Sequence, residues 1–179
     1  MILRTWKGIL GRRQVLLGGA AACLGALAAR RASAAAPPQL PASDGLAFKP
    51  SVGPSGIQFL DYDPPRRWAA GARVGNIVYL AGATARDPAT GQGVRGTIEE
   101  QTELVCQNIQ RALKAYGTDF AHVFKLTVYL TNMDHLVPMG RVRARYIPRP
   151  IPSTTVAVAR LSEPYFLVEI DATALIPGG

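Results

Sequence analysis

The stretch GNIVYLAG at residues 75–82 decides the fold, together with VAVARL at 156–161 and VEIDA at 168–172. These stretches are rich in apolar and β-branched residues and are bounded by turn residues, which is typical of β-strands. One long helical pattern and a further strand lie between the first stretch and the second. Strands interleaved with helices in this way predict an α+β domain.

Local signals predict the first half of this domain. Residues 77–81 form an apolar strand, and after a turn the chain returns as a short strand at 93–96. Thr97 and Glu100 have the spacing of a capping box, in which each side chain bonds the other residue's backbone N–H. The helix that they open ends at Gly117. Its apolar face carries Ile98, Val105, Ile109, Ala112 and Tyr116.

The second half of the domain is also expected to contain both strands and a helix. Residues 124–131 alternate between apolar and polar, which predicts a strand with one buried face. A second helix is expected at 135–146, and a closing hairpin is expected to pair 154–161 with 165–175. One more strand is expected near 57–60. Two helices cover only one face of this mixed sheet of five or six strands, so we expect the other face to pack against copies of itself.

The first residues of the chain resemble an export signal. Arg12 and Arg13 precede an uncharged stretch at 15–29, and Ala-Ser-Ala at 32–34 offers a cleavage site. Paired arginines before a mildly apolar stretch are similar to a twin-arginine signal. We therefore expect a signal peptide at 1–34, a periplasmic or secreted protein, and contact with a membrane only during export. An ordinary secretory signal and a retained anchor are the alternatives.

Removing this segment changes the charge balance. Six of the 20 Lys and Arg residues lie within residues 1–34, whereas all 12 acidic residues lie from Asp44 onward. The chain from residue 35 therefore carries 14 basic against 12 acidic residues, a net charge of about +2 rather than +8. Such a balance gives little support for binding nucleic acid. Cys106 is the only cysteine left, which excludes an intrachain disulfide after cleavage.

Domain boundaries follow from composition. Residues 35–54 contain five prolines among Ser, Gly and Asp, which predicts a disordered linker. The residues that follow, 55–179, suit one domain with one core.

The order of these elements and the sequences of the strand motifs resemble those of the Rid family of reactive-intermediate deaminases. Its members are also called YjgF-like or endoribonuclease L-PSP proteins. The resemblance covers residues 68–177. It implies a chorismate-mutase-like fold, a homotrimer with pockets between subunits, and a small-molecule substrate without a cofactor.

The resemblance also assigns positions to a site. Glu169 matches the glutamate that positions the hydrolytic water, and Gly82 matches a glycine whose backbone binds substrate. Trp68 stands where the family usually has a tyrosine that lines the pocket. Gly140 stands where an asparagine is common.

The resemblance breaks at the catalytic arginine. Ser153 occupies that position, and Thr154 and Thr155, which follow it, are expected to bind substrate. An arginine there binds a substrate carboxylate through two hydrogen bonds, which a hydroxyl cannot do. Whether Arg145 or Arg149 takes over the role of this arginine stays open. The resemblance therefore implies catalysis by Glu169 and Ser153, with weak activity on 2-imino acids.

Other motifs indicate structure rather than chemistry. The glycines of 91–96 match a dinucleotide fingerprint, but no strand feeds directly into them, so we interpret them as a turn. His122, His135 and Cys106 lack the spacing of metal ligands, so no metal site is predicted.

Four arginines at 141, 143, 145 and 149 form a basic cluster, but they do not share one helix face. We therefore expect no nucleic-acid partner.

Two functions remain as hypotheses. The first is an enzyme that hydrolyses a small enamine, imine or related C–N bond in a cleft between subunits. The second is a trimer that binds a small metabolite without turnover. A ribonuclease is the weakest hypothesis, because the charge after export is near neutral.

Overall fold

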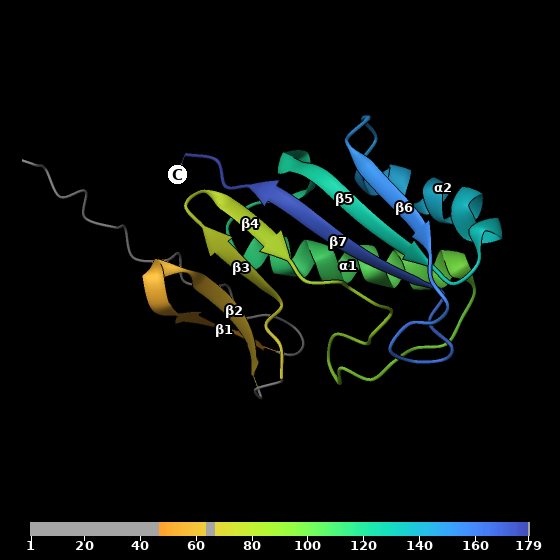
Figure 1. The fold of residues 1–179 in the computed structure, drawn as a ribbon, viewed down its shortest axis with the longest axis horizontal. Helices are drawn as coiled ribbons and strands as arrows, with labels where there is room; N and C mark the ends of the chain where they lie inside the picture. Colours follow the sequence, from red (N-terminus) through yellow and green to blue (C-terminus); the bar gives the residue numbers. More distant parts are fainter. Residues whose placement is uncertain (1–46, 64–66, 179) are drawn as a thin grey trace, which may run out of the picture. The chain divides into compact units, whose positions relative to one another are not determined.

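Seven strands form one sheet in the computed structural model, which describes residues 47–63 and 67–178 (Figure 1). Their order across the sheet is β1-β2-β3-β4-β7-β5-β6. The strands are β1 (Ala47–Val52), β2 (Gln58–Asp63), β3 (Gly71–Val74), β4 (Ile77–Leu80), β5 (Val123–Leu130), β6 (Ser153–Ala157) and β7 (Val168–Leu175). The α-helices are α1 (Ile98–Ala115) and α2 (Leu136–Tyr146), and short 3₁₀ helices are η1 (Pro54–Gly56), η2 (Phe120–His122) and η3 (Met133–His135).

The predicted α+β class with two helices is confirmed, whereas the sheet has seven strands rather than five or six. β1 lies inside the predicted linker 35–54, where its proline had indicated loop. Pro50 is tolerated there because β1 is an edge strand, which does not need every backbone N–H for pairing. The predicted strand at 93–96 is wrong, since only an isolated bridge joins Arg86 to Gly93.

The predicted closing hairpin is also wrong. β6 pairs in parallel with β5, with Leu126 opposite Ser153, and β7 enters on the other side of β5 in antiparallel orientation. A parallel pair requires a crossover, and α2 supplies it between β5 and β6. The long connection after β6 then carries the chain past β5, so that β7 lies between β4 and β5.

Helix α1 begins with the predicted capping box. The Thr97 hydroxyl accepts from the N–H of Glu100 (3.2 Å), and the Glu100 carboxylate accepts from the N–H of Thr97 (2.8 Å). Gly117 follows the helix with a φ of 75°, the left-handed conformation that glycine adopts without a steric cost. Both predicted ends of the helix are therefore confirmed.

The core lies between the sheet and α1. Figure 1 shows both helices on one side of the sheet, where α1 crosses behind β4 and β7. The predicted apolar face of α1 is buried throughout. The residues that face it from β5 and β7 are also buried, at 2% exposure or less: Leu126, Val128, Leu130, Val168, Ile170, Ala172 and Ala174.

The opposite face of the sheet, here called the open face, is mixed rather than apolar. Val74, Tyr79 and Leu175 are exposed by 40% or more at one end of it. Its middle carries polar side chains, among them Glu169 and Asp171 on β7. The packing argument for self-association therefore applies to one end of this face only.

Among the described residues, no helix is both long enough and apolar enough to cross a bilayer. The predicted signal at 1–34 lies outside the residues that the structure describes.

Candidate functional site

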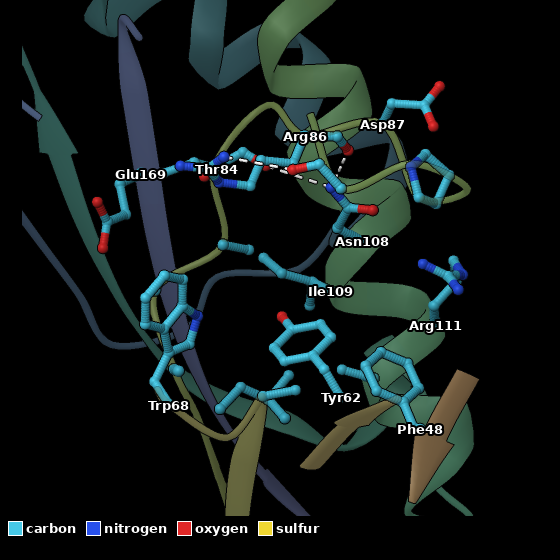
Figure 2. Close-up of a pocket in the computed structure, with 18 of the residues that line it drawn as sticks. Phe48, Tyr62, Trp68, Thr84, Arg86, Asp87, Asn108, Ile109, Arg111 and Glu169 are labelled. Atoms are coloured by element: carbon cyan, nitrogen blue, oxygen red, sulfur yellow. Dashed lines mark hydrogen bonds between the residues drawn. The ribbon is translucent and has the colours of Figure 1, made fainter. Parts of the chain in front are cut away.

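A cavity of about 380 Å³ opens where β4 ends, between the following loop, α1 and the β1–β2 hairpin. Its lining includes three residues singled out from the sequence: Trp68, Gly82 and Glu169 (Figure 2). A volume of this size falls in the ordinary range for small-molecule sites, about 300–1,000 Å³. The structure therefore gathers three of the predicted site residues around one cavity within a single chain.

Gly82 makes room for the carboxylate of Glu169. The N–H of Ala81 donates to Ala70 O (2.9 Å), and Ala83 and Ile170 exchange two backbone hydrogen bonds (2.9 and 3.1 Å). These bonds hold the backbone of residue 82 against β7. A Cβ atom on Gly82 would overlap the carboxylate of Glu169. In the described part of the chain, the N–H of Gly82 donates to no backbone acceptor, which leaves it able to bind a ligand.

Glu169 is half-buried, and its environment disfavours the charged form. Burial raises the pKa of this carboxyl above its usual range, and the nearby Asp171 carboxylate raises it further, whereas Arg86 lowers it. Burial likewise raises the pKa of Asp171, although a hydrogen bond from the Tyr129 hydroxyl (3.0 Å) opposes the shift. Two carboxyl groups that share one sheet face thus make Glu169 a better proton acceptor than a solvated glutamate.

Aromatic rings form another wall. Trp68 is 55% exposed, although a tryptophan has much apolar surface to bury. Figure 2 shows its ring between Glu169 and Tyr62, and the Tyr62 ring packs against Phe48 with centroids 5.5 Å apart. The wall predicted at Trp68 thus extends onto the β1–β2 hairpin.

The loop after β4 is anchored to α1 by an amide. Asn108 Nδ2 donates to the carbonyl oxygens of Thr84 (3.2 Å) and Arg86 (2.7 Å). The Arg86 guanidinium lies 3.6 Å from a Glu163 carboxylate oxygen and donates to Gly91 O (3.3 Å). Sequence reasoning missed Asn108 and Arg86, although a polar residue beside the apolar face of α1 was an available signal.

The remaining predicted site residues do not line this cavity. Across the sheet, Glu169 pairs with Tyr129, which pairs with Val156, so Ser153 lies two strands away and further along β6. Ser153 pairs with the buried Leu126 and so faces the helix side. Thr154 accepts from Lys125 Nζ (2.8 Å) on the open face.

Thr155 lies on β6 as well, and Gly140 lies on α2 with open space where a Cβ would stand. Within one chain, Gly140 and the three hydroxyl residues 153–155 of β6 therefore lie away from Glu169.

Comparison with known proteins decides the family. The model described as Endoribonuclease L-PSP matches residues 61–176, which is more than half of the chain. The chain belongs to the endoribonuclease L-PSP family.

Several members of the endoribonuclease L-PSP family resemble the chain along most of their own length. A RutC family protein of Pyrococcus horikoshii is 39% identical over 103 residues, which are 57% of this chain and 81% of the relative. The bovine 2-iminobutanoate/2-iminopropanoate deaminase is 31% identical over 102 residues, 57% of this chain and 74% of that protein. The crystal structure of RidA from an Antarctic Psychrobacter is 29% identical with a TM-score of 0.58, covering 62% of this chain and 89% of that one. The fold is therefore the Rid fold.

In this endoribonuclease L-PSP family member, two arginines of the basic cluster are engaged in structural contacts. Arg145 donates to a Glu103 carboxylate oxygen (2.6 Å). Arg149 donates to the carbonyl oxygens of Ala121 (2.8 Å) and Val123 (2.6 Å). Neither is placed to act beside Glu169 in the same chain.

The turn lies at residues 88–90, just before the glycine-rich stretch 91–96, which is irregular apart from the bridge of Gly93 to Arg86. The N–H of Asp87 donates to Gln92 O (2.8 Å), and the Asp87 carboxylate accepts from the N–H groups of Ala89 and Thr90, both at 2.8 Å. The capping box of α1 occupies the N–H groups of Thr97 and Glu100 at the point where this stretch meets the helix.

The described residues contain no group of three or more His, Cys, Asp or Glu side chains that could hold a metal ion. Burial raises the pKa of the Cys106 thiol to about 12, so this cysteine carries no thiolate at neutral pH. His122 contacts Asp119 at 2.8 Å at the start of η2.

Proposed function

We propose that the chain hydrolyses a small imine or enamine at Glu169, in a site completed by a neighbouring subunit. The observation that carries the proposal is the half-buried Glu169 carboxylate, which lies against Gly82 in the cavity. Burial raises the pKa of this carboxyl. The names of two relatives support the reaction class, since one is an iminobutanoate/iminopropanoate deaminase and another is Reactive Intermediate Deaminase A of Arabidopsis.

The chemistry requires one water and one proton acceptor. Glu169 accepts a proton from the water as the water oxygen attacks the carbon of the C=N bond, and it passes that proton to the nitrogen, which becomes an amine. Glu169 then takes the proton of the new hydroxyl group as the C=O bond forms and delivers it to the leaving nitrogen, so that ammonia and a carbonyl compound are released. In this proposal the N–H of Gly82, which donates to no backbone acceptor in the described part of the chain, donates to the substrate beside that carboxylate.

Assembly supplies the missing part of this site. β6 is an edge strand with Ser153, Thr154 and Val156 exposed, and the open face has an apolar end, so both surfaces suit contact between subunits. In the proposed homotrimer, Ser153, Thr154, Thr155 and Gly140 of one subunit face Glu169 of the next. The family resemblance assigns a catalytic arginine to the position of Ser153, so weak activity on 2-imino acids is expected.

A substrate comparison tests this function. We expect ammonia release from neutral imines or enamines generated in the assay, and slower release from 2-imino acids, because no guanidinium replaces the one absent at Ser153. Rates are followed by coupled ammonia detection or by loss of imine absorbance. A buffer control gives the spontaneous hydrolysis rate.

Rates equal to that control for every imine and enamine would leave the alternative, a trimer that binds a small metabolite without turnover. Cleavage of RNA would instead support the activity in the family's name. Its dependence on salt would reveal whether phosphate contacts are involved.

We also propose that the protein is exported by the twin-arginine route to the periplasm or beyond. The paired Arg12 and Arg13 before an uncharged stretch support this route. We expect Arg12→Lys combined with Arg13→Lys to leave precursor in the cytoplasm, measured by cell fractionation and immunoblotting. Unchanged export of the double variant would rule out this route in favour of general secretion.

A further inference from the structure

The end of the cavity remote from Glu169 is formed by a ring of the first strand. Phe48 of β1 stands opposite Tyr62 of β2 in the antiparallel hairpin, and their rings pack with centroids 5.5 Å apart. The guanidinium carbon of Arg111 on α1 lies 5.4 Å from the centroid of the Phe48 ring. Phe48 is therefore held both by the hairpin and by α1. Figure 2 shows it on the side of the cavity away from Glu169.

Flat apolar surface connects Glu169 with Phe48. Trp68 and Tyr62 line the cavity between them (Figure 2), and more than half of Trp68 is exposed. Apolar residues of the sheet and of α1 belong to the same lining: Ala70, Leu80, Ile109 and Ala112. An apolar group that extends from Glu169 into this region would leave water and cover Trp68, which is favourable. An aromatic group would also gain from tilted or offset contacts with the neighbouring rings.

Phe48 lies outside the part of the chain that matches the family model. The match covers residues 61–176, whereas β1 ends at Val52. Tyr62 and Trp68 lie within the match, and Phe48 closes the space beside them from outside it. The depth of the cavity at this end therefore depends on a strand that the family model does not include.

We infer that the substrate carries an aromatic group on a short apolar chain, and that Phe48 sets the longest chain that the cavity accepts. The aromatic group lies along Trp68 and Tyr62. A longer chain would press this group against Phe48, which its contacts hold in place, and overpacking of this kind is destabilising. The position of the reacting C–N carbon, beside Glu169, rests on the proposed function. The aromatic subsite depends on packing alone, so its test uses binding without turnover.

Trp68 reports binding at this subsite. The chain contains two tryptophans, Trp6 and Trp68, so the full-length Trp6→Phe protein keeps one tryptophan, which lines the cavity. The probes are uncharged primary amides, whose planar C–N group stands in for that of the substrate: 2-phenylacetamide, 3-phenylpropionamide, 4-phenylbutyramide, 5-phenylpentanamide and 6-phenylhexanamide. The counterpart without an aromatic ring is 3-cyclohexylpropionamide. Dissociation constants come from titrations of Trp68 fluorescence.

The Trp6→Phe protein should show a chain-length limit. Affinity should rise about fourfold for each methylene that the cavity buries, and it should fall at the first probe whose ring is pressed against Phe48. We expect 3-phenylpropionamide to bind more tightly than its cyclohexyl counterpart, because a flat ring makes the closer contacts with Trp68 and Tyr62.

Substitutions of Phe48 in the same background should move this limit. Phe48→Ala opens the end of the cavity, so the first probe that was disfavoured should bind about tenfold or more tightly. Phe48→Leu should move the limit in the same direction by less, and it carries the test if circular dichroism shows that Phe48→Ala is unfolded. Phe124→Ala is the matched control and should leave the limit unchanged, because Phe124 is an exposed ring on β5 that does not line the cavity.

The outcomes separate this inference from the proposed function. The inference is wrong if no probe changes Trp68 fluorescence, if the cyclohexyl amide binds as tightly as the phenyl amide, or if the Phe48 variants keep the original limit, even when the protein hydrolyses imines. A limit that moves with residue 48, without hydrolysis of any imine or enamine, would sustain the aromatic subsite and refute the enzyme.

Discussion

Replacing Glu169 by Gln should reduce imine hydrolysis by roughly a hundredfold to ten-thousandfold, the usual contribution of a positioned proton acceptor. The amide keeps the shape that Gly82 accommodates, but it cannot take a proton from water. The measurement is kcat and KM for ammonia release at several pH values. We expect kcat to fall while KM changes little, because the lost interaction belongs to the transition state.

The acid limb of the pH profile gives a second readout. The parent needs ionised Glu169, whose pKa is raised first by burial and then by Asp171, so its activity should fall at a higher pH than for a solvated glutamate. Asp171→Asn removes the second cause and lies outside the cavity lining, so the acid limb should move to lower pH. A Glu169→Gln variant with the parent's kcat and acid limb would exclude Glu169 as the proton acceptor.

The Glu169→Gln substitution, which lowers activity, should increase the stability of the fold. A carboxyl with a raised pKa in the folded state stabilises the fold below its unfolded pKa, and this contribution is lost as pH rises through the folded pKa. The parent therefore loses unfolding free energy over the window from the ordinary glutamate pKa up to the raised one. Glu169→Gln does not titrate, so its stability relative to the parent should increase across that window.

Local chemistry made part of the fold predictable. α1 was predicted from its capping box, its apolar spacing and Gly117, all of which act within the helix itself. The strand at β5 followed from alternation. The closing hairpin was wrong because strand order depends on which partner β7 meets, and that partner, β5, lies far away in the sequence.

The residues of the candidate site were likewise only partly predictable from the sequence. Glu169, Gly82 and Trp68 were assigned through a family resemblance, and the structure gathers them around one cavity. Phe48 and Arg111 were missed because they come into contact only when β1 forms, and the Lys and Pro in β1 are typical of a linker rather than a strand. Pairing with β2 overrides that local preference, since an edge strand needs hydrogen bonds on one side only.

Ser153→Arg should increase turnover of 2-imino acids. The guanidinium would bind the substrate carboxylate through two hydrogen bonds, a contact that contributes on the order of 1.5–3 kcal/mol, or about ten- to a hundredfold in affinity. The gain should appear as a lower KM for 2-imino acids and should be absent for neutral imines. Ala157→Arg is the matched control, because residue 157 is also exposed on β6 but lies roughly 13 Å further along the strand.

Subunit mixing then tests whether residue 153 acts across a subunit boundary. Within one chain, Ser153 lies two strands from β7, so the guanidinium introduced by Ser153→Arg should serve Glu169 of a neighbour. A Ser153→Arg, Glu169→Gln double variant should be inactive alone, yet co-assembly with the parent should give 2-imino acid turnover above the parent's own. In such assemblies the double variant supplies the guanidinium and the parent supplies the glutamate. Turnover no higher than the parent's, with mixed assemblies verified by mass spectrometry, would show that position 153 does not reach a neighbour's Glu169.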